Sequence, residues 1–304
     1  MKLLLALAAA LTLIVAVSSA MLRLSLGGAG CTPWPACYET RADHAVQTSL
    51  TPEQVPGWHR GVRHAHRVTA SLAGLLFLMA TLFGWRRWSY SERCAALVLL
   101  AVSVGLALLG RYTPSPLPVV VQANLLGGHL LLAALAWLLV RPRLANHSSA
   151  TTAAWLPALA VLLMILVLSQ AAFGGLVSAR SAAAACQDGG CPAVPVDADG
   201  AFDPLRPNTT LPPSVHAPQR QAVLHWHTVS GMLTVAVALV VAWGARRCVP
   251  GPAMALGSVA VTVPLLGWLM RAYPMPLATT VAHSVLAAVL LALATGVRRR
   301  LRRA

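Results

Sequence analysis

The stretch Val62–Trp85, VRHAHRVTASLAGLLFLMATLFGW, is an apolar run of membrane-spanning length with two histidines, His64 and His66, in its first turns. A similar arrangement returns at Ala222–Trp243, AVLHWHTVSGMLTVAVALVVAW. Both runs begin with a His-x-His triplet, and a pair of arginines follows each of them. The repetition indicates that the chain is a duplicated half, with a first unit at 1–147 and a second at 148–304.

The composition is that of an integral membrane protein. Of the 304 residues, 57% are hydrophobic and only 10% are charged, and the mean hydropathy is +0.69. Such a chain has too little polar surface for a soluble domain of this size. The net charge of +15 gathers at the ends of apolar runs, so it is explained by membrane topology and does not predict a nucleic-acid partner.

Eight runs are long enough to cross about 30 Å of hydrocarbon at roughly 1.5 Å per helical residue. They predict an all-α protein of two four-helix bundles related by pseudo-symmetry, surrounded by membrane lipid. The runs are Leu3–Leu22, Val62–Trp85, Cys94–Gly110, Val119–Val140, Ala153–Val177, Gln221–Trp243, Ala253–Met270 and Leu277–Val297.

The loop charges predict the orientation of these spans. If the N-terminus lies inside, more than half of the Lys and Arg residues lie in inner segments, with Glu92 as their one acid. This asymmetry favours cytoplasmic termini in a bacterial inner membrane. Met1–Ala20 also has the pattern of a cleavable signal peptide, but the fifth run occupies the matching place in the second half, which favours a retained first helix.

Each long outer loop carries a close pair of cysteines. Cys31 and Cys37 follow the first run, and Cys186 and Cys191 follow the fifth. Their spacing, on the oxidising side of the membrane, predicts two disulfides within the loops, with four unpaired thiols as the alternative.

Four histidines lie within the predicted spans, one on each even-numbered helix: His66, His129, His227 and His283. Ionisable side chains inside a membrane are usually functional, and facing histidines in a helical bundle are common axial ligands of haem iron. A lone histidine would be read as a hydrogen-bonded core residue, but four in a repeated pattern favour haem. His64 and His225 are alternative ligands on other helix faces.

The depth of each histidine tests this pairing. His227 and His283 both lie about six residues into their runs, roughly 10 Å at the helical rise, and could clamp one iron. His66 lies about four residues deep and His129 about ten, a mismatch of roughly 9 Å. The first pair is therefore less regular than the second.

These features together resemble the COX15/CtaA haem A synthase family. The resemblance covers almost the whole chain and rests on the eight-helix repeat, the loop CTPWPAC at Cys31–Cys37, the His66-Arg67 pair and VAHSVLAA around His283. It implies oxidation of a haem O methyl group to the formyl group of haem A for cytochrome oxidase assembly. Haem O synthase and cytochrome oxidase assembly factors are the partners it implies.

The resemblance also implies roles for individual residues. His66 and His129 would hold the substrate haem, and His227 and His283 would hold a haem b that relays electrons. Arg67 would receive a propionate.

The chain departs from the family pattern at several positions. Arg63 stands where a glutamate is common, and an arginine cannot act as a base. His64 is the nearest group able to exchange protons near neutral pH. Thr228 also replaces the arginine that commonly follows the histidine of the sixth helix.

Three other functions remain open. A diverged haem-binding or electron-relay protein would keep the histidines without making haem A. A membrane thiol-disulfide enzyme working with quinone would use the cysteine pairs but would not need the histidines. A transporter is disfavoured because paired intramembrane acids and broken helices are missing from the pattern.

Overall fold

The computed structural model describes residues 1–25, 57–110, 117–140, 153–180, 182–184, 200–206, 213–272 and 277–301. Within these ranges the regular structure is entirely helical, as predicted. A short 3-10 helix, η3, spans Ala182–Ala184. The eight long helices are α1 (Lys2–Ser25), α4 (Gly57–Gly84), α5 (Tyr90–Leu109), α6 (Pro118–Leu139), α7 (Leu156–Ala179), α8 (Pro213–Ala245), α9 (Pro250–Ala272) and α10 (Leu277–Leu301).

All eight helices are long and apolar enough to cross a membrane, which makes this a multi-pass membrane protein. An α-helix satisfies its backbone hydrogen bonds within itself, so an apolar run in lipid has little choice of structure. The predicted spans are confirmed as helices. The largest differences from the predicted starts are in α4, which begins at Gly57, and α8, which begins at Pro213, because polar turns continue these helices beyond their apolar segments.

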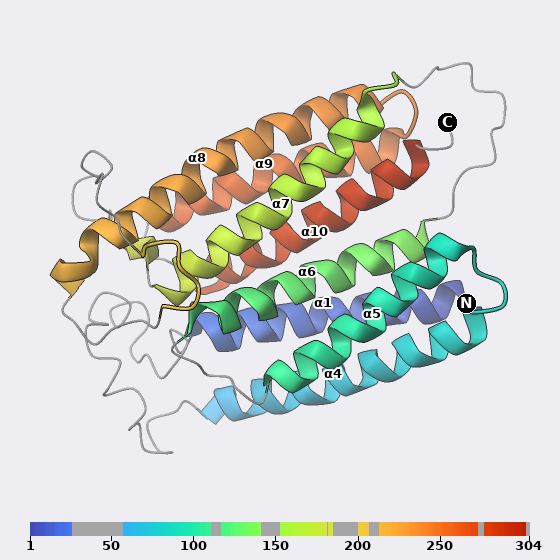
Figure 1. Cartoon of the computed structure of the whole chain (residues 1–304), viewed down its shortest axis with the longest axis horizontal. Coiled ribbons are helices and arrows are strands. Elements are labelled where there is room, and N and C mark those ends of the chain that lie inside the picture. The colour runs from blue at the N-terminus through green and yellow to red at the C-terminus, as the bar shows by residue number, and fades with distance from the viewer. Residues whose placement is uncertain are drawn as a thin grey trace.

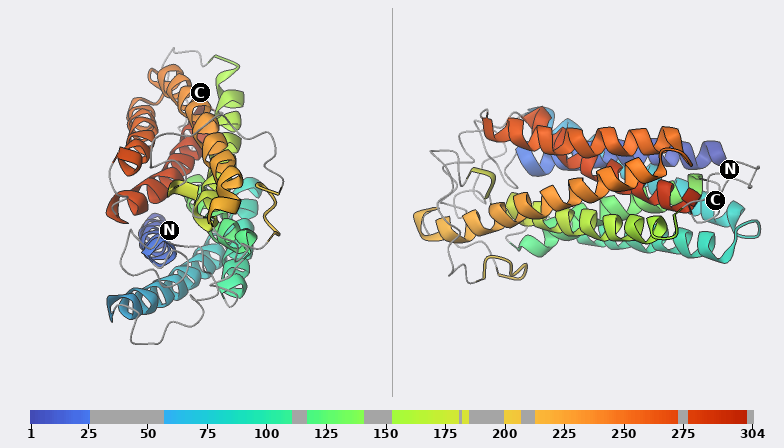
Figure 2. Two further views of the ribbon diagram at one scale, coloured as in Figure 1. Left: turned by 90° about the vertical axis from the view of Figure 1, so that its left-hand side faces the viewer. Right: turned by 90° about the horizontal axis from the view of Figure 1, so that it is seen from above.

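The helices run side by side along the long axis of the molecule (Figures 1 and 2). In the first half α1 packs on α4, α4 on α5, α5 on α6, and α6 on α1; helices α7 to α10 repeat this order of contacts. The two sets meet where α6 packs on α7 and α10 and where α1 packs on α10. On this pattern we propose that the chain consists of two related four-helix halves.

Small residues allow close helix packing at this junction. A Cβ added to Gly175 of α7 would lie only 3.1 Å from the Cα atom of Gln122 of α6. The Gln122 side chain donates to the carbonyl of Ala172 at 3.0 Å. Such close contacts and interhelical hydrogen bonds are what hold helices together in lipid, where the hydrophobic effect does not act between them.

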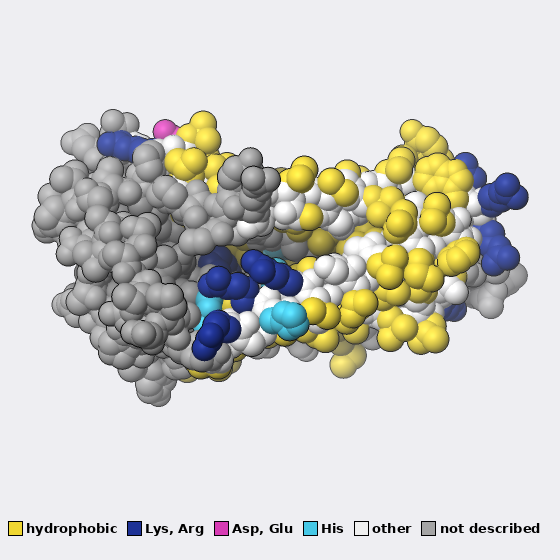
Figure 3. All heavy atoms as spheres, turned by 90° about the horizontal axis from the view of Figure 1, so that it is seen from below, with side chains coloured by type: hydrophobic (Ala, Val, Ile, Leu, Met, Phe, Trp, Pro, Cys, Tyr) yellow, Lys and Arg dark blue, Asp and Glu magenta, His cyan; other side chains and the backbone are white. Residues whose placement is uncertain are grey.

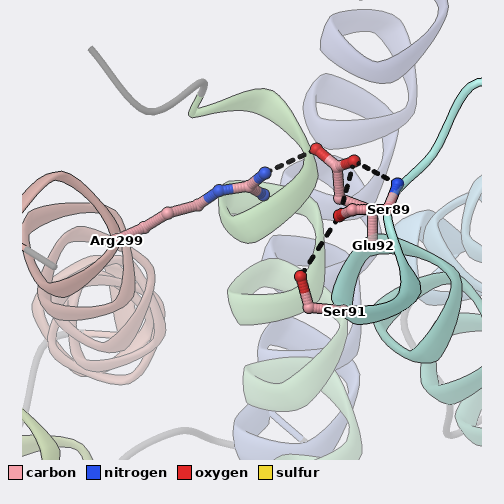
Figure 4. Close-up of polar contacts among 4 residues, drawn as sticks. All are labelled: Ser89, Ser91, Glu92 and Arg299. Atoms are coloured by element: carbon pink, nitrogen blue, oxygen red, sulfur yellow. Dashed lines mark hydrogen bonds and ion pairs between the residues drawn. The ribbon is translucent and has the colours of Figure 1, made fainter. Parts of the chain in front are cut away.

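Both termini lie at the same end of the bundle, on the right in Figure 1. At this end Glu92 of α5 is held by three donors (Figure 4). Arg299 of α10 donates to its Oε1 atom at 2.5 Å. The N–H and hydroxyl groups of Ser89 each donate to Oε2 at 2.9 Å. The contact therefore joins the cap of α5 in the first half to the last turn of α10.

At the opposite end, residues 200–206 contact the N-terminal end of α6 and the C-terminal end of α7. Arg180 donates to the carbonyls of Gly200 and Asp203 at 3.1 and 2.8 Å. The N–H group of Val119 donates to the carbonyl of Pro204 at 2.9 Å. Burial lowers the pKa of the Arg180 guanidinium; neighbouring Arg206 lowers it further and Asp203 raises it. This segment ties part of the connection between α7 and α8 to the bundle.

Candidate functional site

The histidines of α8 and α10 face each other. The ring centres of His227 and His283 are 6.3 Å apart, with 67° between the ring planes. Both side chains are partly buried. Two long helices from the same half thus bring two imidazoles to one place.

This spacing fits a metal held between the rings. An imidazole nitrogen lies about 2 Å from a bound first-row metal and the ring centre roughly 1.1 Å beyond it, so two axial imidazoles have centres roughly 6.2 Å apart. The observed 6.3 Å meets this requirement. No cluster of three or more His, Cys, Asp or Glu side chains that could hold a metal ion occurs among the described residues.

A backbone contact orients His283. Its Nδ1 atom lies 2.9 Å from the carbonyl oxygen of Val263 on α9. A carbonyl only accepts, so Nδ1 carries the proton and donates it, which leaves the lone pair of Nε2 for a ligand bond. Metal-binding histidines usually have such a second contact, which fixes the ring and its tautomer.

The turn of α8 that carries His227 is fixed by Gln170 of α7. The Gln170 amide donates to the carbonyl of His227 at 2.7 Å and accepts a hydrogen bond from the Ser230 hydroxyl at 3.1 Å. Gly231 makes room for this contact, because an added Cβ would lie 2.5 Å from the amide nitrogen of Gln170. The position of His227 is therefore set by α7 as well as by its own helix.

In the first half, His129 of α6 has a favourable chemistry for ligation. The side chain is 2% exposed, and its Nδ1 atom donates to the carbonyl of Leu125 at 2.8 Å. Its Nε2 atom is buried without a hydrogen-bond partner. A buried lone pair without a donor is unfavourable unless a ligand satisfies it.

His66 of α4 is held differently. Its Nδ1 atom shares a hydrogen bond of 3.0 Å with the hydroxyl of Ser18 on α1. Among the described residues, the structure records no ring contact between His66 and His129, in contrast to the pair in the second half. The two halves thus differ in how closely their histidines approach.

The remaining predicted residues of α4 lie on its surface. His64, Arg63 and Arg67 are exposed. An Nη2 atom of Arg63 lies 3.4 Å from Nδ1 of His59. In the second half His225 is partly buried beside His227 but packs its ring against Trp226.

Sequence reasoning missed several polar residues around the histidines. Gln170 and Ser18 were visible as isolated polar residues within apolar runs, but their partners depend on the rotation of each helix about its axis.

His59 is 1% exposed, with a buried Nε2 atom that has no hydrogen-bond partner, and it precedes the predicted start of its span. Arg23 of α1 donates to Ser284 at 2.9 Å, so the first half reaches the residue beside His283.

The cysteine pairs Cys31–Cys37 and Cys186–Cys191 lie outside the described residues, and their pairing stays a prediction. Peptide mass mapping of the non-reduced protein should find one bridge within each loop. Four free thiols, or bridges from one loop to the other, would contradict it.

Comparison with known proteins identifies the family of this chain. The family model described as cytochrome oxidase assembly protein, COX15-CtaA, matches residues 2–295. The chain belongs to the COX15-CtaA family. It is also 31% identical over 187 residues to the haem A synthase of Shewanella oneidensis. That alignment covers 58% of this chain and 56% of the relative, so little more than half of the relative's length is matched.

Proposed function

We propose that this protein is a haem A synthase that oxidises a methyl group of haem O to the formyl group of haem A. The imidazole pair of His227 and His283, 6.3 Å apart, is the observation that carries the proposal, and the family match over residues 2–295 gives it context. The protein would act in a bacterial inner membrane with both termini in the cytoplasm. Haem O synthase would supply the substrate, and cytochrome oxidase assembly would consume the product.

The second half would hold a haem b between His227 and His283. When bound, that group supplies one-electron transfer to the rest of the protein. The protein's contribution is to orient the ligands: Val263 fixes the tautomer of His283, and Gln170 fixes the turn of His227. Both contacts would keep the rings aligned without a carboxylate partner.

The first half would hold the substrate haem between His66 and His129. Leu125 directs Nε2 of His129 away from the backbone, and Ser18 holds His66 through Nδ1. Each of these histidines would offer its Nε2 atom to the substrate haem. The less regular geometry suits a substrate, which must enter and leave, better than a resident group.

Arginines at the outer end of α4 would receive the propionates of that haem. Arg60, Arg63 and Arg67 are exposed and follow a spacing of three and four residues, which places them along one side of the helix. In Figure 3, Lys/Arg and His side chains gather beside a hollow in the surface. Guanidinium groups match carboxylates in shape and charge, and Arg67 follows His66 directly.

Arg63 requires a route for protons other than the glutamate common in the family. His64 is exposed and next in sequence, so it can exchange protons with water. We therefore assign proton transfer at this site to His64.

Complementation tests the proposal. In a bacterial strain that lacks its own haem A synthase, this chain should restore haem A in extracted membranes. His66→Ala should abolish the product, and His64→Ala should lower it by about 10²-fold or more, the usual contribution of a general acid or base, while the haem content of the purified protein stays unchanged. His225→Ala, the corresponding change in the second half, is the matched control.

A second candidate is a haem-binding relay without synthase activity, favoured by Arg63 and by the missing ring contact between the described His66 and His129. Membranes that contain the inserted protein and its haem b but no haem A would support this reading and reject the synthase.

A further inference from the structure

A pocket lies where α4 ends and the turn to α5 begins. It has a volume of ≈ 430 Å³ and is lined by Thr81, Leu82, Phe83, Trp85, Arg86 and Arg87. This volume falls in the range of roughly 300–1,000 Å³ typical of small-ligand sites. The pocket belongs to the end of the bundle that carries the termini, away from His64 and His66 at the start of α4.

The turn that forms this pocket is fixed on two sides. Arg93 of α5 donates its Nε–H to the carbonyl of Trp85 at 2.9 Å and lies 5.6 Å from the centre of its ring. Trp88 packs against Gly84 so closely that an added Cβ would overlap its ring. Arg86 and Arg87 therefore extend from a well-defined backbone.

The lining combines positive charge with exposed apolar surface. Arg86 and Arg87 are exposed, and the structure records no hydrogen bond, ion pair or ring contact from either guanidinium to another described residue. Leu82 and Phe83 beside them are 66% and 65% exposed. Leu75 and Leu78 continue the exposed apolar face along α4 at helical spacing.

We propose that this pocket binds the headgroup of an anionic phospholipid. Its phosphate would lie between the guanidinium groups of Arg86 and Arg87, which suit phosphate oxygens in charge and geometry. Its acyl chains would follow the exposed leucines of α4 into the membrane. Basic pockets at the ends of membrane helices have this preference for anionic lipid.

The second half provides a natural control, because Arg246 and Arg247 follow α8 as Arg86 and Arg87 follow α4. There, however, Arg246 lies over the ring of Trp243, 3.3 Å from its centre, and donates to the Trp243 carbonyl at 2.6 Å. That guanidinium is engaged by its own helix. We therefore expect specific lipid binding in the first half only.

Native mass spectrometry of the detergent-purified full chain can measure the binding of phosphatidylglycerol and phosphatidylcholine. The double variant Arg86→Gln with Arg87→Gln should weaken phosphatidylglycerol binding roughly 30-fold, at ~1 kcal/mol for each arginine. Arg246→Gln with Arg247→Gln removes the same charge and should change binding less than about threefold. Phosphatidylcholine binding should be the same in all three proteins.

Unchanged phosphatidylglycerol binding in the first variant, or an equal loss in both, would overturn the proposal. Inorganic phosphate is a further arm: if millimolar phosphate displaces the lipid, the pocket is a free-anion site and the lipid assignment fails. Should the glutamine variant not fold, the unmodified chain must still bind phosphatidylglycerol more tightly than phosphatidylcholine. Equal binding of the two lipids rejects the proposal.

Discussion

If His227 and His283 hold a haem b as proposed, replacing His283 with alanine is expected to remove a low-spin b-type spectrum from the purified protein. The substitution removes one of two imidazoles whose centres lie 6.3 Å apart, and loss of even an outer contact to a metal ligand typically weakens binding 10–100-fold. His227→Ala should have the same effect, because each ring would supply one of the two ligands to the haem iron. Haem content, from reduced pyridine haemochrome spectra, should fall by about one haem per chain.

The control for this pair is His225→Ala. It lies two residues before His227 on another side of α8 and contacts Trp226, so its loss should leave the spectrum intact. Unchanged haem content in both His227→Ala and His283→Ala would show that the rings do not hold the haem.

The second large effect is expected at the contact between Glu92 and Arg299, whose side chains are 19% and 5% exposed. Arg299→Met or Glu92→Gln should each lower the free energy of unfolding, by about 3 kcal/mol for Glu92→Gln, because removing one partner leaves the other buried without its counter-charge. Glu92→Gln keeps an oxygen that can accept from Ser89, so the cap of α5 is largely preserved. Unfolding in mixed micelles would measure both losses.

A double-mutant cycle separates this pair from its surroundings. The double variant should recover much of the loss, giving a coupling energy of about 2 kcal/mol, whereas independent sites add within about 0.5 kcal/mol. The ring of Trp137, 4.8 Å from the Arg299 guanidinium, contributes separately through its π face. Simple additivity of the two substitutions would show that the ion pair contributes nothing to stability.

The fold was predictable because an apolar run in lipid must form a helix. The eight predicted spans are confirmed, and the errors lie at polar ends such as Pro213–Arg220, which extend α8 beyond its apolar part. Hydropathy marks where a helix enters the membrane; it does not mark where the helix begins. For this reason α8 begins eight residues before the predicted start at Gln221.

The candidate site was predictable only in part. Matched depth in the repeat indicated that His227 and His283 belong together, and the structure brings their rings together. Their role as haem ligands remains our proposal. The hydrogen bonds of Gln170 and Ser18 could not be predicted, because they depend on the rotation of each helix about its axis. The partner of Glu92 could not be predicted either, because it lies 207 residues away.

The separation of 207 residues between Glu92 and Arg299 determines when their contact can form during synthesis of the chain. At roughly 5–20 residues per second, a ribosome needs about 10–40 s to add the 207 residues between Glu92 and Arg299. Throughout that interval the carboxylate of α5 has no arginine from α10 to pair with, whatever the state of the first four spans. The contact between Glu92 of α5 and Arg299 of α10 can therefore form only after the last turn of α10 has been synthesised. The two sets of helices reach their final packing late in translation.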